Sequence, residues 1–285
     1  LALFIVVYFV FEFPLDSFLL SIFYLISVVV GSVTGIFYAY PYLRWDFKNY
    51  AVWLGRLASF GKYVFGNSIS SLLFRSTDNF VTSTYFGTAV SAYYNSCWRI
   101  SNLVDLPSQV FADVLFPKAA KYNSTDRNVI KNMYEKTVGA ILIFSIPTLG
   151  GIIASPGFIL HILAGNQFTV AAPILRITAF FGFALPFLKH FRIIMDATGH
   201  PHISFRVMFL ALCVNIVANL IGVHFFGIIG AALGTAFTYT AIFVITQVIL
   251  YKWFNIRLVN VFKNTFNFYR EIIASRGAFL SHLKG

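Results

Sequence analysis

The chain alternates long runs of apolar residues with short polar connections. An α-helix needs about 20 predominantly apolar residues to cross the hydrocarbon core of a bilayer. Runs of about this length occur at 17–40, 63–85, 89–116, 137–155, 171–196, 204–224 and 228–251. Residues 1–11 resemble the second half of one more run, so we expect the chain to be a fragment of a longer protein. The pattern predicts an all-α, polytopic transmembrane helix bundle with seven full spans plus one partial span.

Two neighbouring predicted spans each carry one polar stripe. The first stripe consists of Asn67, Ser71, Arg75, Asp78 and Thr82. The second consists of Asn95, Arg99, Asn102, Gln109 and Asp113, with Leu106 at the one apolar step. Steps of three and four residues place side chains on one face of a helix. A charge inside a bilayer costs roughly 2.5–3.5 kcal/mol by insertion scales, so such residues normally face protein or a water-filled cavity. We therefore expect the stripes to line a solvated cavity in a membrane transporter.

Lysine and arginine residues are concentrated in every second connection. They occur in 41–62, in 117–136, at Arg206 and in 252–285. The alternate connections 12–16, 85–88, 156–170 and 225–227 contain none. Because cytoplasmic loops are enriched in Lys and Arg, we expect 41–62 and the C-terminal tail to be cytoplasmic. The tail also mixes aromatic with basic residues, which predicts an amphipathic segment at the inner membrane surface.

The composition supports a membrane protein and excludes several other classes. Hydrophobic residues make up 58% of the chain, charged residues only 11%, and the mean hydropathy is +0.77. Ordinary soluble domains contain about 25% charged residues. The net charge of +11 lies mostly in the connections, so it does not indicate a nucleic-acid partner. Cys97 and Cys213 both lie in apolar runs, which argues against a disulfide framework.

Several charged residues lie inside the predicted spans, and each has two interpretations. The cations are Arg75, Arg99, Arg176, Lys189 and Arg192, and the carboxylates include Asp78, Asp105 and Asp113. The functional interpretation places Arg75, Asp78, Arg99, Lys189 and Arg192 in the cavity. In the structural one, Arg75 and Asp78 neutralise each other three positions apart. Lys189 and Arg192 then extend to the cytoplasmic face, and Arg176 is an interfacial anchor.

The sequence contains no familiar catalytic or metal-binding motif. There is no His-Glu-x-x-His motif, no Cys pair at metal-binding spacing and no phosphate-binding loop with a lysine. His200 and His202 flank Pro201, and a plain turn explains them better than a metal site. We therefore expect neither an enzyme nor a bound cofactor or metal.

Short motifs in the same runs resemble one known family. They are STDNF at 76–80, FGTAVSAYY at 86–94, FPK at 116–118, ILAGNQF at 162–168, AAPIL at 171–175, DATG at 196–199 and GIIGAALGT at 227–235. Their order and spacing resemble the bacterial polysaccharide flippases. These form the lipid-linked oligosaccharide branch of the multidrug/oligosaccharidyl-lipid/polysaccharide exporter superfamily.

The resemblance implies two six-helix lobes around a central cavity that work by alternating access. Residues 1–40 would then be the last two spans of the first lobe, and 41–62 a cytoplasmic linker. Residues 63–251 would form the second six-helix lobe, and 252–285 a basic amphipathic cytoplasmic tail. The implied location is the bacterial cytoplasmic (inner) membrane, with several passes and a cytoplasmic C-terminus.

The function implied is the flipping of a polyprenyl-pyrophosphate-linked oligosaccharide for O-antigen, capsule or exopolysaccharide. Candidate groups for the diphosphate or acidic sugars are the cations Arg75, Arg99, Lys189 and Arg192. Candidates for hydrogen bonds to sugar hydroxyls are Asn95, Asn102 and Gln109. The implied partners are this lipid-linked substrate, membrane lipids, H⁺ or Na⁺ as coupling ion, and glycan polymerase machinery.

Two alternatives remain open at this stage. A cation-coupled multidrug exporter of the same superfamily would use Asp78 to bind the coupling cation. A membrane glycan polymerase or ligase would need a large external loop with charged residues. The longest predicted external connection, 156–170, has no Lys, Arg, Asp or Glu, which disfavours this alternative.

Overall fold

The computed structural model describes residues 17–42, 50–122 and 127–282, which are almost entirely helical and contain no strand. The contacts divide the chain into two compact units, 1–54 and 55–285. The first unit contains α2 (Ser17–Ala39), the 3₁₀ turn η1 (Tyr40–Tyr42) and the start of α3 (Tyr50–Ser101). Within this unit, the apolar segment Ser21–Tyr42 is long enough to cross a membrane.

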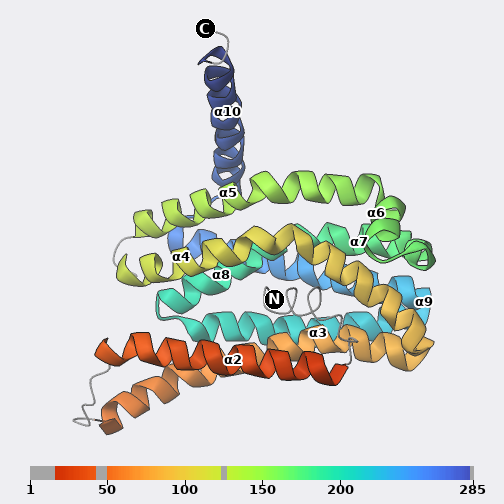
Figure 1. Cartoon of the computed structure of the whole chain (residues 1–285), viewed down its shortest axis with the longest axis horizontal. Helices are drawn as coiled ribbons and strands as arrows, with labels where there is room; N and C mark the ends of the chain where they lie inside the picture. Colours follow the sequence, from red (N-terminus) through yellow and green to blue (C-terminus); the bar gives the residue numbers. More distant parts are fainter. Residues whose placement is uncertain (1–16, 43–49, 123–126, 283–285) are drawn as a thin grey trace. The chain divides into compact units, whose positions relative to one another are not determined.

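The second unit is a bundle of helices and short 3₁₀ turns that begins with the rest of α3 (Figure 1). The turn η2 (Asn102–Asp105) leads into α4 (Leu106–Tyr122), and α5 (Arg127–Ala154) follows. Next come α6 (Pro156–Leu163), η4 (Asn166–Ala171), α7 (Ala172–Gly182) and α8 (Leu185–Ala197). The unit ends with α9 (Pro201–Phe254) and α10 (Leu258–His282).

The two longest helices bend where the sequence predicts short external connections. Gly87 interrupts α3 with φ 81° and Gly227 interrupts α9 with φ 62°. Positive φ is accessible to glycine at little steric cost. These glycines fall within the predicted connections 85–88 and 225–227, so the predicted breaks are confirmed although each connection is a kink within one helix.

Other predicted boundaries differ from the observed ones. The predicted span 171–196 is two helices, because the chain breaks at 183–184 just before Pro186. The predicted span 89–116 is interrupted by η2, just before Pro107. Proline lacks a backbone N–H and therefore cannot donate the next hydrogen bond of a continuous helix, which explains both breaks. The predicted connection 156–170 is itself mostly helical.

The predicted linker 41–62 lies partly outside the described residues, and its part from Tyr50 onward belongs to α3. Residues 1–11, the predicted partial span, also lie outside them. By length and composition, four described helical segments could cross a membrane: Ser21–Tyr42, Arg127–Ala154, Asn166–Ala197 and Pro201–Phe254. An all-α membrane bundle therefore fits the structure, while the number of seven full spans stays a prediction.

Two apolar clusters form the core of the second unit, with polar residues between them. Along α3, Phe74 belongs to one cluster and Val81 to the other, and Asp78 lies between them. Along α9, Leu212 and Val223 belong to the two clusters in the same order. The buried α9 polar residues Asn215, Asn219 and Thr235 lie between cluster residues in the sequence. A polar layer therefore crosses the core at the level of Asp78.

The two halves of α9 pack closely after the kink at Gly227. A Cβ atom on Gly230 would overlap the carbonyl group of Gly222, and one on Gly234 would lie 2.7 Å from the backbone of Ala218. Small residues permit this approach, as they do at other membrane helix contacts. The approach brings Thr235 within hydrogen-bond distance of Asn215 and Asn219.

The contact predicts a strong effect of side-chain size at Gly230. A Gly230→Val substitution should lower the thermal unfolding temperature in detergent, because overpacking typically costs roughly 1–3 kcal/mol and a backbone overlap is a severe case. Gly150→Val is the matched control, since a Cβ there meets nothing within 4 Å. Equal unfolding temperatures for the two variants would contradict the observed α9 packing.

Candidate functional site

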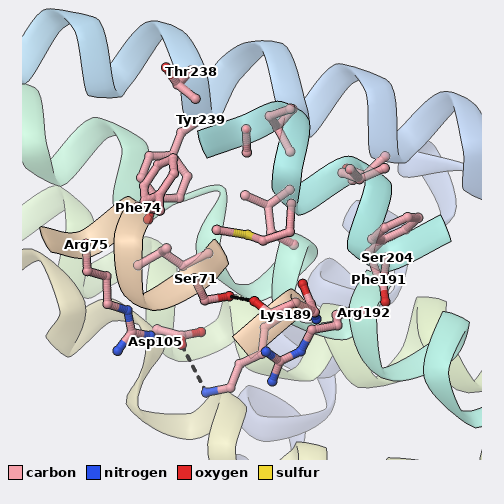
Figure 2. A pocket seen from close by; sticks show the side chains of 18 of the residues that line it. Ser71, Phe74, Arg75, Asp105, Lys189, Phe191, Arg192, Ser204, Thr238 and Tyr239 are labelled. Atoms are coloured by element: carbon pink, nitrogen blue, oxygen red, sulfur yellow. Dashed lines mark hydrogen bonds and ion pairs between the residues drawn. The ribbon is translucent and has the colours of Figure 1, made fainter. Parts of the chain in front are cut away.

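A cavity of about 200 Å³ opens between α3, η2, α8 and α9. Its charged lining residues are Arg75, Asp105, Lys189 and Arg192, which Figure 2 shows at one end of the cavity. Three cations therefore face one carboxylate. Lys189 Nζ lies 3.2 Å from Asp105 Oδ2, and these two side chains are 24% and 17% exposed. The remaining positive charge favours an anionic ligand.

Aromatic side chains form an adjoining wall of the cavity. The Arg75 guanidinium lies 5.7 Å from the centre of the Trp98 ring. The Tyr239 ring packs edge-on against Phe74 at 5.3 Å and stacks on Phe181 at 4.8 Å. Ring packing restricts these side chains, so the cationic end lies beside an aromatic wall.

Two further recesses adjoin this cavity and share residues with it. One is lined by Gln109, Asp113, Lys189 and Arg192. The other is lined by Arg75, Asp78, Asn95, Trp98 and Arg99. Shared side chains connect the recesses to the cavity: Lys189 and Arg192 on one side, Arg75 and Trp98 on the other. The structure thus brings all eight sequence-predicted site residues to this connected surface: Arg75, Asp78, Asn95, Arg99, Asn102, Gln109, Lys189 and Arg192.

The predicted polar side chains differ in how free they are to contact a ligand. The Asn102 amide donates a 2.8 Å hydrogen bond to the Trp98 carbonyl, and the Asn95 amide lies 3.5 Å from Ser91 Oγ. The Gln109 amide donates to Asp113 at 3.4 Å. Arg99 is exposed at the edge of its recess. To bind Asn95, Asn102 or Gln109, a ligand would have to replace these hydrogen bonds. At Arg99 it would not have to displace a carboxylate, because no described carboxylate pairs with that arginine.

Asp78 is buried at the base of its recess, with only 3% of its surface exposed. Its Oδ2 accepts a hydrogen bond from the Tyr94 hydroxyl at 2.9 Å. Its Oδ1 accepts hydrogen bonds from Thr235 at 2.9 Å, Asn219 at 3.0 Å and Asn215 at 3.5 Å. Asp78 is thus held by neutral donors, while Arg75 points to Trp98 instead, so pairing of Arg75 with Asp78 is not the observed arrangement.

The Asp78 cluster also holds oxygen atoms that lack donors. Among the described residues, the buried Asn215 Oδ1 and Asn219 Oδ1 have no hydrogen-bond partner. Carboxylate, amide and hydroxyl oxygens are the ligands that hard cations such as Na⁺ and Ca²⁺ take. The described residues contain no group of three or more His, Cys, Asp or Glu that could hold a metal ion. The cluster has a single carboxylate, so it suits a monovalent cation or a proton better than a divalent ion.

Sequence reasoning missed some residues of the site. Asp105 fits the spacing of the second stripe, three residues after Asn102 and four before Gln109, but the predicted stripe has Leu106 at this step; the structure pairs Asp105 with Lys189 and leaves Leu106 60% exposed. Asn215 and Asn219 are spaced i, i+4 within an apolar run, a signal of the kind used for the first two stripes. Thr235 and Tyr239 gave no signal, because Thr and Tyr are common in membrane helices.

The hydrogen bonds predict that Asp78 stabilises the bundle. Replacing Asp78 with Ala leaves several buried donors without their acceptor, at roughly 1–3 kcal/mol for each unsatisfied group. The variant should unfold at a markedly lower temperature in detergent. Asp113→Ala is the control, since that carboxylate is exposed and accepts one long hydrogen bond. An unchanged unfolding temperature for Asp78→Ala would contradict a structural role.

Comparisons with known proteins agree on one family. A family model described as "Polysaccharide biosynthesis protein" matches residues 13–173. The "probable low-salt glycan biosynthesis flippase Agl15" of Haloferax volcanii is 24% identical over 188 residues, which is 64% of this chain and 39% of that protein. The "probable flippase AglR" of the same organism is 22% identical over 187 residues, 65% of this chain and 39% of that protein.

An uncharacterized membrane protein of Methanocaldococcus jannaschii is 25% identical over 267 residues, 87% of this chain and 52% of that protein. The chain therefore spans about half, or less, of the length of these curated relatives. No solved structure matches.

Proposed function

Because the chain belongs to the family of polysaccharide biosynthesis proteins, we propose that it forms part of a flippase for a polyprenyl-pyrophosphate-linked oligosaccharide. The observation that carries this proposal is the cavity in which Arg75, Lys189 and Arg192 face a single carboxylate beside an aromatic wall. A sugar head and a diphosphate cannot enter hydrocarbon unaided, because their polar groups would lose hydration without replacement. The cavity would supply that replacement while the lipid tail stays in the bilayer.

The cavity side chains divide the cargo between them. Arg75 and Arg192 would hold the diphosphate or acidic sugars, since one guanidinium group can donate two parallel hydrogen bonds to the oxygens of a phosphate. The Lys189 ammonium group would release Asp105 and bind the diphosphate instead. The aromatic wall would pack against sugar rings, and Asn95, Asn102 and Gln109 would bond to hydroxyls. A net positive cavity disfavours cationic drugs, so this observation favours the flippase over the multidrug exporter.

The membrane orientation and the partners follow the same proposal. The protein would lie in the cytoplasmic (inner) membrane with its C-terminus in the cytoplasm, and would move O-antigen, capsule or exopolysaccharide units by alternating access. Glycan polymerase machinery would receive the product. Residues 63–251 would form the second six-helix lobe, and a first lobe would complete the cavity.

The cation cluster generates the first test. In the full-length protein, an Arg75→Ala/Arg99→Ala variant should flip substrate at least roughly 100-fold more slowly, because two lost charged hydrogen bonds at about 1.5–3 kcal/mol each together remove about 3–6 kcal/mol. Flipping is measured as glycan at the cell surface, with the amount of protein in the membrane measured in parallel. Arg176→Ala is the control, because this exposed arginine lies on α7 outside the cavity. Normal surface glycan with the double variant would refute the proposal.

We further propose that the coupling ion, H⁺ or Na⁺, binds at Asp78 with the oxygens of Asn215, Asn219 and Thr235. The support is the buried carboxylate beside two amide oxygens without donors. A bound cation would take the place of the Tyr94 or Asn219 donors and would neutralise the charge of the carboxylate.

An Asp78→Asn variant tests the coupling site without removing the hydrogen-bonding shape. Transport by this variant should lose its dependence on a Na⁺ or pH gradient while the protein stays folded. The control is Asp113→Asn, which should keep the dependence. Full gradient-driven transport by Asp78→Asn would refute the ion site and leave the cargo proposal standing.

A further inference from the structure

The helix α10 is fixed to α5 by hydrogen bonds from buried and half-buried groups. Glu135, which is 4% exposed, accepts a hydrogen bond from the Arg257 backbone N–H at 2.9 Å. The Asn260 amide donates to both Glu135 oxygens at 3.1 Å. Glu135 thus caps the N-terminus of α10, where the helix dipole favours a negative charge.

Further contacts continue this attachment along α5. Thr265 Oγ1 donates to the Gly139 carbonyl at 3.0 Å, and the Tyr269 hydroxyl to the Ile143 carbonyl at 2.6 Å. A Cβ on Gly139 would lie 3.0 Å from the Val261 carbonyl, so the backbones approach closely at this glycine. Figure 1 shows α10 running across the direction of α5.

The face of α10 turned away from α5 is amphipathic. Val259 and Phe266 are 71% and 64% exposed, and Phe262 is 43% exposed while its ring stacks on Phe183 at 6.3 Å. These residues follow each other at steps of three and four, so they share one side of the helix. Lys263 and Arg270, also exposed, lie seven positions apart directly beside this apolar side.

We propose that this face of α10 lies in the headgroup region of the bilayer and binds anionic phospholipids. Two observations identify a lipid surface as the occupant. First, α10 follows α9, an apolar helix long enough to cross a membrane, after only three residues, so it starts at the membrane boundary. Second, the exposed charges from Lys252 to Glu271 are four cations and one carboxylate, which complements phosphatidylglycerol.

Because Glu135 joins α10 to α5, binding of α10 to lipid would also affect the position of α5. A helix held in the interface and hydrogen-bonded to α5 fixes the depth of that end of α5 in the bilayer. Apolar side chains of interfacial helices lie about 5–10 Å into the boundary between headgroups and acyl chains. The attachment would therefore keep this end of the second unit at one leaflet while the remaining helices move. This inference is independent of the cargo.

Spin-label accessibility in the full-length protein tests the inference. The label is placed by Phe266→Cys on the apolar side and by Asn267→Cys, also exposed, as the matched control, in a Cys213→Ser background. The protein is reconstituted in nanodiscs of phosphatidylcholine, with or without phosphatidylglycerol. We expect the label at 266 to contact oxygen from the lipid phase and the label at 267 to contact a water-soluble nickel complex. Phosphatidylglycerol should place the label at 266 deeper.

A charge variant separates lipid binding from simple burial. Lys263→Gln/Arg270→Gln should abolish the phosphatidylglycerol dependence, whereas Arg176→Gln should preserve it. Equal access of the nickel complex to 266 and 267 would show a solvent-exposed face and overturn the proposal. Protection of 266 from both reagents would show a protein partner or a second copy on this face and would overturn it as well. A dependence on phosphatidylglycerol that survives the charge variant would refute the role of Lys263 and Arg270.

Discussion

The buried carboxylate of Asp78 joins α3 to both halves of α9. Asn215 and Asn219 come from the half before the kink at Gly227, and Thr235 from the half after it. A charge or polar group placed in an apolar core is costly unless its hydrogen bonds are satisfied. The sequence meets this requirement by supplying donors from three helical segments, and their convergence in turn fixes the register of the segments. The close approach of Gly222 and Gly230 is what lets the α9 donors reach one oxygen.

The cavity depends on the same layer. Arg75 lies one helical turn before Asp78 on α3, and Thr238 and Tyr239 lie one turn after Thr235 on α9. Because the Asp78 hydrogen bonds set how α3 and α9 face each other, they also set the distance between Arg75 and Tyr239 in the aromatic wall. The Lys189–Asp105 pair performs a similar role between α8 and η2. Two carboxylates, one buried and one partly exposed, thus connect the helices that line a cavity with an excess of positive charge.

The sequence predicted the helical membrane class and the polar stripes, because both follow from the spacing of apolar and polar residues. It also predicted the two breaks at Gly87 and Gly227, because glycine readily adopts the backbone conformation that interrupts a helix. It did not predict the split of 171–196 into α7 and α8 or the turn η2, although Pro186 and Pro107 were visible. A proline in an apolar run either kinks or ends a helix, and tertiary packing decides between the two. The Asp78 donors were also out of reach, since residues 78, 219 and 235 are brought together only by the fold.

The spacing of Arg75 and Asp78 carries a physical consequence for a transporter of this design. Three positions apart, the two side chains were spaced for a local ion pair, which would have cancelled both charges within α3. In the fold the carboxylate is directed into the protein and the guanidinium toward the cavity, so one helical turn joins a buried acid to a cation that lines the cavity. A helix transmits displacement along its length because its backbone hydrogen bonds keep it rigid. At the proposed ion site, replacement of the donors at Asp78 would move α3 against α9, and Arg75 would move with it relative to Lys189 on α8. Such an arrangement, two sites biasing one rigid element, is what reciprocal coupling between an ion and a cargo requires.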